Sequence, residues 1–259
     1  MPTKDVVIVA SENGALRGGK AGGLGDVVRD LPKALGKLGW RISVISPAYG
    51  FLHRENTSKF RSRISFPFGG REEHGDFFEV TVEDHAQNVR YFVFEHPSVS
   101  GNPIYVNDPP NEPFKTDALK YALFCSAVGQ FLKTIHRPYV LHLHDWHAST
   151  LLLLRELHPE FNHLKGIKTA FTIHNLAIQG TRPMRNHASS VESWFPELFV
   201  DSEWIHRWRD PRYEEPCYCP MAVGIQYADK VNTVSASYAK EILMPSTSLG
   251  FYAGEGLEV

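Results

Sequence analysis

Two segments that contain histidine carry the side chains best suited to chemistry. The first is H-L-H-D-W-H at residues 142–147, and the second is the pair His174-Asn175. A carboxylate accepts hydrogen bonds and a neutral imidazole both donates and accepts them. Asp145 and the histidines that flank it, His144 among them, could therefore bind the hydroxyl groups of a sugar. His174 could instead be a structural histidine, but its place at the end of an apolar run favours a site.

The first of these segments allows other interpretations. His142 and His144 point to one side of an extended strand and, with His147, could bind a metal ion. A histidine at a strand end is more often hydrogen-bonded within the fold, so we predict no metal site. Asp145 could simply cap the helix that follows. Trp146 could be a stacking platform, although the core is the place we predict for it.

A glycine-rich segment, G-G-K-A-G-G-L-G-D-V-V at residues 18–28, follows an apolar run at Val6–Ala10 and opens a helical pattern. Glycines let the backbone approach a ligand closely, and the first N–H groups of a helix attract negative charge. Lys20 adds a point charge suited to phosphate. The glycines match neither G-x-G-x-x-G nor the Walker pattern, so the segment indicates an anion site without naming a nucleotide fold. A loop that merely starts a helix fits it equally well.

Apolar runs that alternate with helical patterns predict a parallel sheet with right-handed crossovers. The predicted parallel strands are 6–10, 41–46, 139–143, 168–173 and 230–234. The predicted helices are 23–38 (with Pro32 as a kink or an early-turn residue), 116–135, 149–157, 221–228 and 235–243, the last capped by Ser235. Ligands bind beyond the carboxyl ends of parallel strands. The glycine-rich turn and the two histidine segments all follow such ends, so we expect them to meet at one edge of the sheet.

The remaining segments differ in character from these units. Residues 61–67, 77–83 and 89–95 predict antiparallel strands in an insertion or at a sheet edge. Residues 96–113 form a long loop of a kind that is often functional, and 181–220 predict short helices in a loop-rich region. The predicted fold is therefore α/β, a mostly parallel sheet with an antiparallel insertion.

Composition excludes several classes of function. The formal net charge of −2 over 259 residues gives no reason to expect nucleic acid or anionic lipid as a partner. No apolar run approaches the roughly 20 residues of a membrane span. The sequence has 3 cysteines, an odd number that argues against a disulfide framework and fits the cytoplasm. Cys217 and Cys219 form one C-x-C without a second pair, which argues against zinc.

Five segments together resemble a known family. They are K-A-G-G-L-G-D-V at 20–27, H-D-W-H at 144–147, T-I-H-N-L-A-I-Q-G at 172–180, T-V-S-A-S-Y-A-K-E-I at 233–242 and G-E-G-L-E at 254–258. In order and spacing they resemble the N-terminal half of bacterial glycogen synthase and plant starch synthase, glycosyltransferase family 5. The combination is specific, although no single segment would be, and it extends over nearly the whole chain.

The resemblance implies a fold and a reaction. Residues 1–259 would form a Rossmann-like three-layer sandwich, the N-terminal, acceptor-side half of a GT-B glycosyltransferase. The family's C-terminal nucleotide-binding domain would be absent from this chain. The family transfers glucose from ADP-glucose, with UDP-glucose as the alternative donor, to the non-reducing end of an α-1,4-glucan with retention of configuration. It needs no cofactor, and the half present here would be inactive alone.

The resemblance also implies roles for individual residues. Two would be catalytic and line the sugar subsites: Asp145 and His174. Six would bind substrate, those of the first turn near the donor phosphate: Lys20, Gly22, Gly23, Asp26, His144 and Asn175. No residue is an evident covalent nucleophile, which favours a front-face transfer. A pyrophosphate leaving group needs a cation and N–H donors rather than a metal.

The sequence departs from the family pattern in two places. The approach to Lys20 is S-E-N-G-A-L-R-G-G, longer and richer in glycine than usual, which puts the position of Glu12 in question. The segment T-D-A-L-K-Y at 116–121 matches the family's D-N-x-x-R-F only in part. Two alternatives stay open: a glucan-binding or regulatory module without catalysis, and another two-domain nucleotide-sugar glycosyltransferase such as a sucrose synthase relative.

Overall fold

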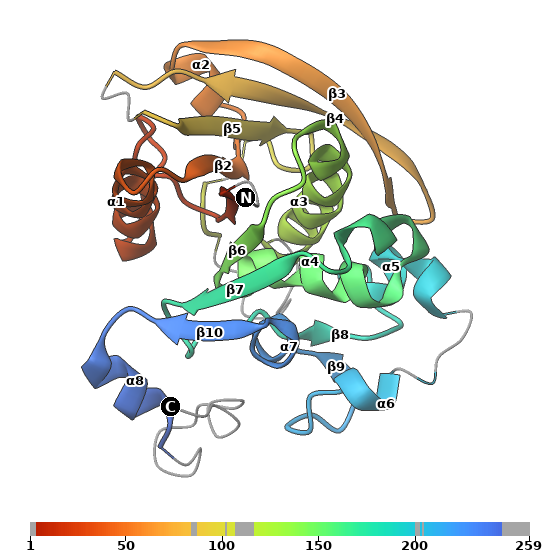
Figure 1. Cartoon of the computed structure of the whole chain (residues 1–259). Helices are drawn as coiled ribbons and strands as arrows, with labels where there is room; N and C mark the ends of the chain where they lie inside the picture. The colour runs from red at the N-terminus through yellow and green to blue at the C-terminus, as the bar shows by residue number, and fades with distance from the viewer. Residues whose placement is uncertain are drawn as a thin grey trace.

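A single large sheet organises the chain in the computed structural model, which describes residues 4–83, 87–101, 103–106, 117–199, 203 and 205–244. Within these residues eight strands form the sheet, in the order β10-β7-β6-β1-β2-β5-β4-β3 (Figure 1). Their bounds are β1 Asp5–Val9, β2 Arg41–Pro47, β3 Ser58–Phe68, β4 Arg71–Val80, β5 Val89–Glu95, β6 Val140–His144, β7 Lys168–Ile173 and β10 Lys230–Thr233.

The six strands from β10 to β5 run parallel, as predicted. In the shared register Val9 of β1 pairs with Leu143 of β6, and Leu143 pairs with Phe171 of β7. All three side chains are fully buried. Strands covered on both faces read as continuous apolar runs, which explains why these strands could be recognised from the sequence. The parallel pairing brings the carboxyl ends of β1, β6 and β7 side by side.

The antiparallel extension is a hairpin of β3 and β4 at the edge of the sheet, joined through Gly69 and Gly70. Both glycines have positive φ, the conformation that favours glycine at a tight turn. The predicted strand at 77–83 is wrong in its bounds, because β4 begins at Arg71. Its first residues are polar and mostly exposed, so no apolar pattern marked them. β5 pairs antiparallel with β4 but parallel with β2, and so joins the two parts.

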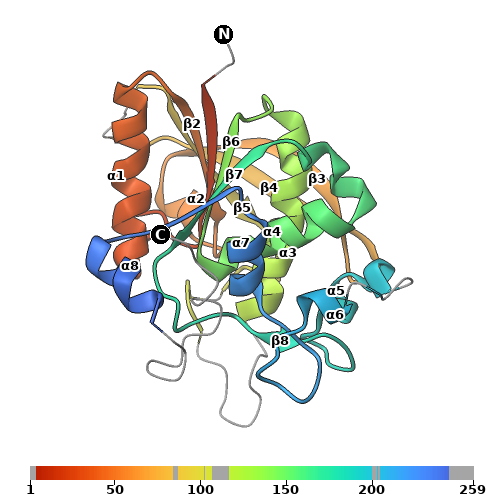
Figure 2. The same ribbon diagram turned by 60° about the horizontal axis from the view of Figure 1, so that its bottom comes forward.

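Helices cover both faces and make the predicted three layers. In Figure 2, α1 and α8 lie on one side of the sheet, and α3, α4 and α7 lie on the other. The helix bounds are α1 Gly23–Lys37, α2 Leu52–Glu55, α3 Asp117–Phe131, α4 Asp145–Leu157, α5 Val191–Trp194, α6 Ile205–Trp208, α7 Pro220–Tyr227 and α8 Ala236–Ile242. The short 3₁₀ helices are η1 Leu132–Thr134, η2 Pro159–Leu164 and η3 Pro196–Phe199.

Two helices differ from the prediction in ways that matter for the site. The helix predicted at 149–157 begins at Asp145, so the H-D-W-H segment spans the end of β6 and the first turn of α4. α1 continues through Pro32, which lies inside it rather than in its early turns. The predicted cap of α8 is confirmed, because Ser235 Oγ accepts a hydrogen bond from the backbone N–H of Tyr238.

The segment 181–220 holds short helices, as predicted, and also a small two-stranded sheet that the sequence did not indicate. Its strands are β8, Arg182–Pro183, and β9, Cys217–Tyr218. Predictions on 107–116 and 245–259, including the G-E-G-L-E segment at 254–258, lie outside the described residues. Among the helices that the structure describes, none has the length and apolarity to cross a membrane.

Candidate functional site

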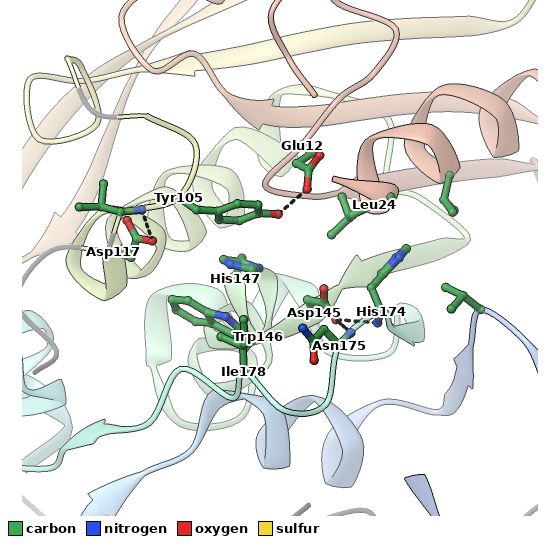
Figure 3. Close-up of a pocket in the computed structure, with 14 residues that line it drawn as sticks. Glu12, Leu24, Tyr105, Asp117, Asp145, Trp146, His147, His174, Asn175 and Ile178 are labelled. Carbon is green, nitrogen blue, oxygen red and sulfur yellow. Dashed lines mark hydrogen bonds between the residues drawn. The ribbon is translucent and has the colours of Figure 1, made fainter. Parts of the chain in front are cut away.

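A cavity of about 600 Å³ opens at the carboxyl ends of β1, β6 and β7. Figure 3 shows side chains from the three following loops, and from the segment after β5, pointing into the same space. The polar and aromatic lining residues are Glu12, Tyr105, Asp117, Asp145, Trp146, His147, His174 and Asn175. The glycine-rich turn contributes Gly23 and Leu24. The expectation that the three polar segments meet at one edge is therefore confirmed.

Asp145 occupies a strained turn between β6 and α4. Its φ is 55°, a left-handed conformation that Asp tolerates better than most residues. Its carboxylate does not cap α4. Instead Oδ1 accepts hydrogen bonds from the backbone N–H groups of His174, at 2.7 Å, and Asn175, at 3.4 Å. The alternative of a simple helix cap is thus wrong, and the carboxylate ties the loop after β7 to the end of β6.

Burial changes the acidity of this carboxyl group. Asp145 is 5% exposed, and burial raises its pKa to about 7, although the two backbone donors act in the opposite direction. Its second oxygen, Oδ2, accepts no hydrogen bond from any residue in the described ranges. A buried carboxyl group with a pKa near neutrality and an oxygen left over is a group suited to a hydroxyl ligand or to proton exchange.

Three imidazoles lie close together behind and beside Asp145. His144 Nδ1 and His174 Nε2 are 2.8 Å apart, and His142 Nε2 lies 2.7 Å from Thr172 Oγ1. Burial lowers the pKa of His142 and of His174 to about 4, and lowers the pKa of His144 well below its usual value. All three rings are therefore neutral near pH 7, which leaves each of them with one donor and one acceptor nitrogen.

His144 itself does not touch the cavity. It is fully buried and stands behind His174, which is the member of the pair that lines the cavity wall. The prediction that His144 contacts substrate directly is therefore corrected: any effect of this ring on a ligand passes through His174. Sequence alternation placed His144 at the strand end correctly, but it could not show that another loop covers the ring.

The arrangement of these histidines is not that of a metal site. His147 turns away from the strand and packs against Tyr121 and Tyr105, with ring centroids 4.5 and 5.2 Å away. No group of three or more metal-ligating side chains occurs among the residues described. The alternative of a metal ion held by His142, His144 and His147 has no geometric support there.

The aromatic wall of the cavity carries polar atoms that lack partners. Trp146 is 6% exposed and His147 is 7% exposed, and both line the cavity. Trp146 Nε1 and His147 Nδ1 are buried and have no hydrogen-bond partner among the described residues. Gly180 makes room for the indole, since a Cβ there would lie 2.2 Å from Trp146 Cε3. Trp146 is thus core, as predicted, and also a wall of the site.

The carboxylate of Glu12 lies against the backbone N–H groups just before the first residue of α1, Gly23. Glu12 is 2% exposed, and its Oε2 accepts hydrogen bonds from the backbone N–H groups of Ala21, at 2.7 Å, and Gly22, at 2.6 Å. Tyr105 donates from its hydroxyl to Glu12 Oε1 at 2.6 Å. The N–H of Gly22, predicted to bind substrate, is therefore already held by a carboxylate of this chain. Gly23, the next residue, lines the cavity.

Lys20 and Asp26 lie beside the cavity rather than in its wall. Lys20 Nζ is 2.7 Å from Asp26 Oδ2, and the Lys20 side chain is 48% exposed. Arg29 Nη1 lies 2.9 Å from the other oxygen of Asp26. The hydrogen bond from Lys20 is the main reason that the pKa of Asp26 is lowered. The predicted roles of both residues in phosphate binding stay predictions.

A buried ion pair anchors the segment that carries Tyr105. Lys120 is 1% exposed, and its Nζ lies 2.7 Å from Asp117 Oδ1. Nζ also donates to the carbonyl oxygens of Pro103 and Ile104, each at 2.9 Å. Asp117 of α3 therefore lines the cavity itself, and with Lys120 it also fixes the chain that holds Tyr105 over the cavity.

Several site residues were missed from the sequence. Tyr105 lies in the loop at 96–113 whose length indicated function, but nothing in the sequence singled out this tyrosine. Glu12 was noted only as a residue of uncertain position. The rim adds Ile178 and Val234, which are 60% and 49% exposed and follow the last two parallel strands of the sheet.

Comparisons with known proteins agree with this geometry. Residues 5–258 match the family model described as starch synthase catalytic domain. A glycogen synthase of Hydrogenobaculum sp. is 30% identical over 233 residues, covering 90% of this chain and 44% of that protein. A glycogen synthase of Lactobacillus acidophilus is 32% identical over 231 residues, covering 86% and 44%. The chain therefore spans less than half the length of these relatives.

A solved structure shows the same fold. The catalytic domain of starch synthase IV from Arabidopsis thaliana, bound to ADP and acarbose, superposes with a TM-score of 0.74 at 22% identity. The match covers 97% of this chain and 48% of that one. The predicted α/β fold, with its mostly parallel sheet, is confirmed by the coordinates and by this likeness.

Proposed function

Because the chain belongs to the starch synthase catalytic domain family, we propose that it is the acceptor-side half of a retaining hexosyltransferase. In this proposal the enzyme transfers glucose from ADP-glucose to the non-reducing end of an α-1,4-glucan, and UDP-glucose is the alternative donor. A second domain would supply the other wall of the cleft and most contacts to the nucleotide. The relatives named glycogen synthase, and the ADP and acarbose of the Arabidopsis protein, support this choice of substrates.

The observation that carries the proposal is a set of polar atoms of cavity-lining residues that lack a partner among the described residues. Trp146 Nε1 must donate a hydrogen bond and His147 Nδ1 can donate or accept one, and both atoms are buried without a partner there. The hydrogen bonds of the Asp145 carboxylate to the described residues are both made by Oδ1, so Oδ2 can accept one from a ligand. A buried polar atom without a partner costs about 1–3 kcal/mol, so a ligand that satisfies these atoms gains that free energy on binding. A sugar carries donors and acceptors on neighbouring carbons, and an aromatic ring beside them suits its apolar face.

The residues would have distinct roles in this reaction. Asp145 and His174 would touch the sugar at the reacting end, where a carboxylate stabilises positive charge that develops at the anomeric carbon. Gly22, Gly23 and Lys20 would face the donor phosphates, with Lys20 leaving Asp26 to do so. Asn175 would hold the sugar beside His174. The three free cysteines fit the reducing cytoplasm that we propose as its compartment.

Calorimetric titration of the purified 259-residue chain with maltohexaose tests the proposal. We expect binding, and we expect Asp145→Ala to weaken it at least about tenfold, because one buried acceptor is lost. Arg90→Gln, at the amino ends of the parallel strands and so on the far side from the cavity, is the matched control and should bind like the wild type. Equal affinity of all three proteins would remove the cavity from the proposal.

A transfer assay with labelled ADP-glucose and maltohexaose tests the division of the cleft. The chain alone should not extend the glucan, because the nucleotide would have only one wall to bind. Extension by the 259-residue chain at a rate typical of an enzyme would contradict the need for a second domain.

One observation favours the alternative of a glucan-binding module without catalysis. Lys20, the candidate phosphate ligand, is already paired with Asp26. The N–H of Gly22 already donates a hydrogen bond to Glu12. Titration with ADP-glucose separates the two functions. A half-enzyme should bind it weakly and lose that binding in Lys20→Ala, whereas a glucan-binding module should bind maltohexaose alone.

A further inference from the structure

The hydrogen bond between two neutral imidazoles ties a fully buried histidine to a residue of the cavity wall. His144 Nδ1 and His174 Nε2 are 2.8 Å apart, so one nitrogen carries the hydrogen and the other accepts it. His144 has no exposed surface, whereas His174 lines the cavity. The direction of this bond decides which nitrogen of His174 carries its hydrogen, and so what His174 offers to a ligand.

The other nitrogen of His144 fixes that direction. His144 Nε2 is buried and has no hydrogen-bond partner among the described residues. If His144 accepted the bond at Nδ1, its hydrogen would sit on Nε2 as a buried N–H without an acceptor. If His144 donates from Nδ1, Nε2 is left only with an unused lone pair. Buried N–H groups without a partner are the rarer of the two in folded proteins, which favours His144 as the donor.

A ring on the same strand shows the contrasting arrangement. Thr172 Oγ1 donates to Asn232 Oδ1 at 2.6 Å, so it accepts from His142, whose hydrogen is therefore on Nε2. The rings of His142 and His144 are neighbours, with centroids 4.3 Å apart. Two adjacent buried histidines on β6 thus have opposite tautomers. The partner of His142 is Thr172 on β7, and the partner of His144 is His174, the residue after β7.

We propose that His144 is a positioning residue that holds His174 with its hydrogen on Nδ1, so that His174 presents a hydrogen-bond donor to the cavity. His174 then selects a ligand oxygen that accepts a hydrogen bond, such as a sugar hydroxyl or a phosphate oxygen. The tautomer follows from the geometry alone, whereas the choice of a sugar or sugar phosphate as ligand rests on the proposed function.

Long-range ¹H–¹⁵N correlation spectra of the ¹⁵N-labelled chain at pH 7 measure the tautomer of each histidine directly. We expect His174 and His144 to carry hydrogen on Nδ1 and His142 to carry it on Nε2. In His144→Phe the ring is kept but the donor is lost, so the His174 signals should move to a mixture of both tautomers or to the Nε2–H form. His142→Phe is the matched control, and it should leave the Nδ1–H form of His174 in place.

Two results would overturn the inference. One is the finding that His174 of the wild-type chain carries its hydrogen on Nε2. This measurement does not depend on whether any variant folds. The other is a folded His144→Phe variant whose His174 tautomer is unchanged. A loss of dispersed amide signals in His144→Phe would leave the wild-type tautomer measurement to decide.

Ligand titration separates this inference from the proposed function. Maltohexaose or ADP-glucose, each added to the labelled wild type, should shift the Nδ1 resonance of His174 while the tautomer stays the same. If neither probe shifts it but the tautomer is as expected, the positioning role of His144 stands and the proposed ligand is wrong. If a probe binds and converts His174 to the Nε2–H form, the donor role is wrong and the site remains.

Discussion

One cavity lies at the amino ends of the parallel strands (the amino-terminal edge) and another at their carboxyl ends (the carboxyl edge), and the charged groups that line them differ in how they are paired. At the amino-terminal edge a cavity of about 430 Å³ is lined by charged residues that are already paired. Arg41 holds both oxygens of Asp5 at 2.6 Å, and Arg90 holds both oxygens of Glu79 at 2.9 and 3.0 Å. At the carboxyl ends of the strands the lining side chains of Glu12, Asp117, Asp145 and His147 are buried, and among the described residues only Asp117 of these four has an ion pair, with Lys120.

The pKa shifts separate the two edges further. The hydrogen bond from Arg90 lowers the pKa of Glu79 and keeps it charged, whereas burial raises the pKa of Asp145 to about 7. A cavity therefore does not identify a site by itself. What distinguishes the carboxyl ends of the strands is a set of groups whose hydrogen bonds or charges are incomplete among the described residues, and a ligand can complete them.

The largest effect that should separate the edges is acid destabilisation. Burial lowers the pKa of His142 and of His174 to about 4, and lowers those of His144 and His147 well below the ordinary value of 6.5. Below pH 6.5 these histidines are protonated in the unfolded chain but stay neutral in the folded chain. The free energy of unfolding therefore falls as the pH falls. Each histidine contributes about 1.4 kcal/mol per pH unit. Asp145 acts in the opposite direction, because its pKa is raised from 3.8 to about 7 in the folded chain. Between these two pH values it offsets the contribution of one histidine.

Urea unfolding followed by circular dichroism at several pH values between 7 and 4 measures this effect. The free energy of unfolding should fall by several kcal/mol over that range. A flat profile would mean that these histidines are hydrated or charged in the folded chain, and the contrast between the edges would be lost.

Removal of the buried charge at Lys120 should have the next largest effect. Lys120→Met removes the cation beside Asp117 and the Nζ donor to the carbonyl of Pro103, whereas the carbonyl of Ile104 keeps the hydroxyl of Tyr121 as a donor. We expect a loss of about 3–5 kcal/mol in the free energy of unfolding. Lys120→Arg keeps the charge and should lose less. If Lys120→Met lost under about 1 kcal/mol, the ion pair would not anchor the segment under Tyr105.

Asp145→Asn should stabilise the chain, and only at high pH. The folded state raises the pKa of Asp145, so its stabilising contribution is present at low pH and is lost as the pH rises through about 7. Asparagine tolerates the positive φ and keeps an acceptor for the His174 N–H. We expect the variant to gain about 1–3 kcal/mol at pH 8 and nothing near pH 4. Thermal unfolding at both pH values checks this, and a gain that does not depend on pH would contradict it.

The smallest effect is expected at the amino-terminal edge. Arg90→Gln breaks a two-point ion pair, but the Arg90 side chain is 46% exposed and water replaces its partner. The loss should be under about 1 kcal/mol and should shrink in high salt. A loss above about 2 kcal/mol in the same urea experiment would show that exposure does not explain the difference between the edges.

Much of the fold could be predicted from the sequence because its signals are local. The buried runs at β1, β6 and β7 are continuous and apolar, and the topology of parallel strands then brings their ends together. The antiparallel strand β4 was misplaced because its exposed start has no apolar period. The start of α4 was missed because the conformation of Asp145 depends on a contact 29 positions away.

The parts of the site that could not be predicted depend on long-range contacts. Tyr105 and Glu12 meet although they are 93 positions apart, and no local pattern indicates that pair. His144 fitted a binding role by type and position, yet another loop covers it. Trp146 shows a different limit, since one side chain serves both core and cavity, and a sequence pattern distinguishes only buried from exposed.

The left-handed backbone at Asp145 has a consequence for the order in which the chain folds. The amides that hold its carboxylate belong to His174 and Asn175, so the turn has no reason to keep its shape until β7 has docked beside β6. We therefore expect the turn at Asp145 to be completed late in folding and to open early when β7 loosens. Hydrogen exchange at the amide of His174 would report both events, and faster exchange there than along β1 is the expected pattern.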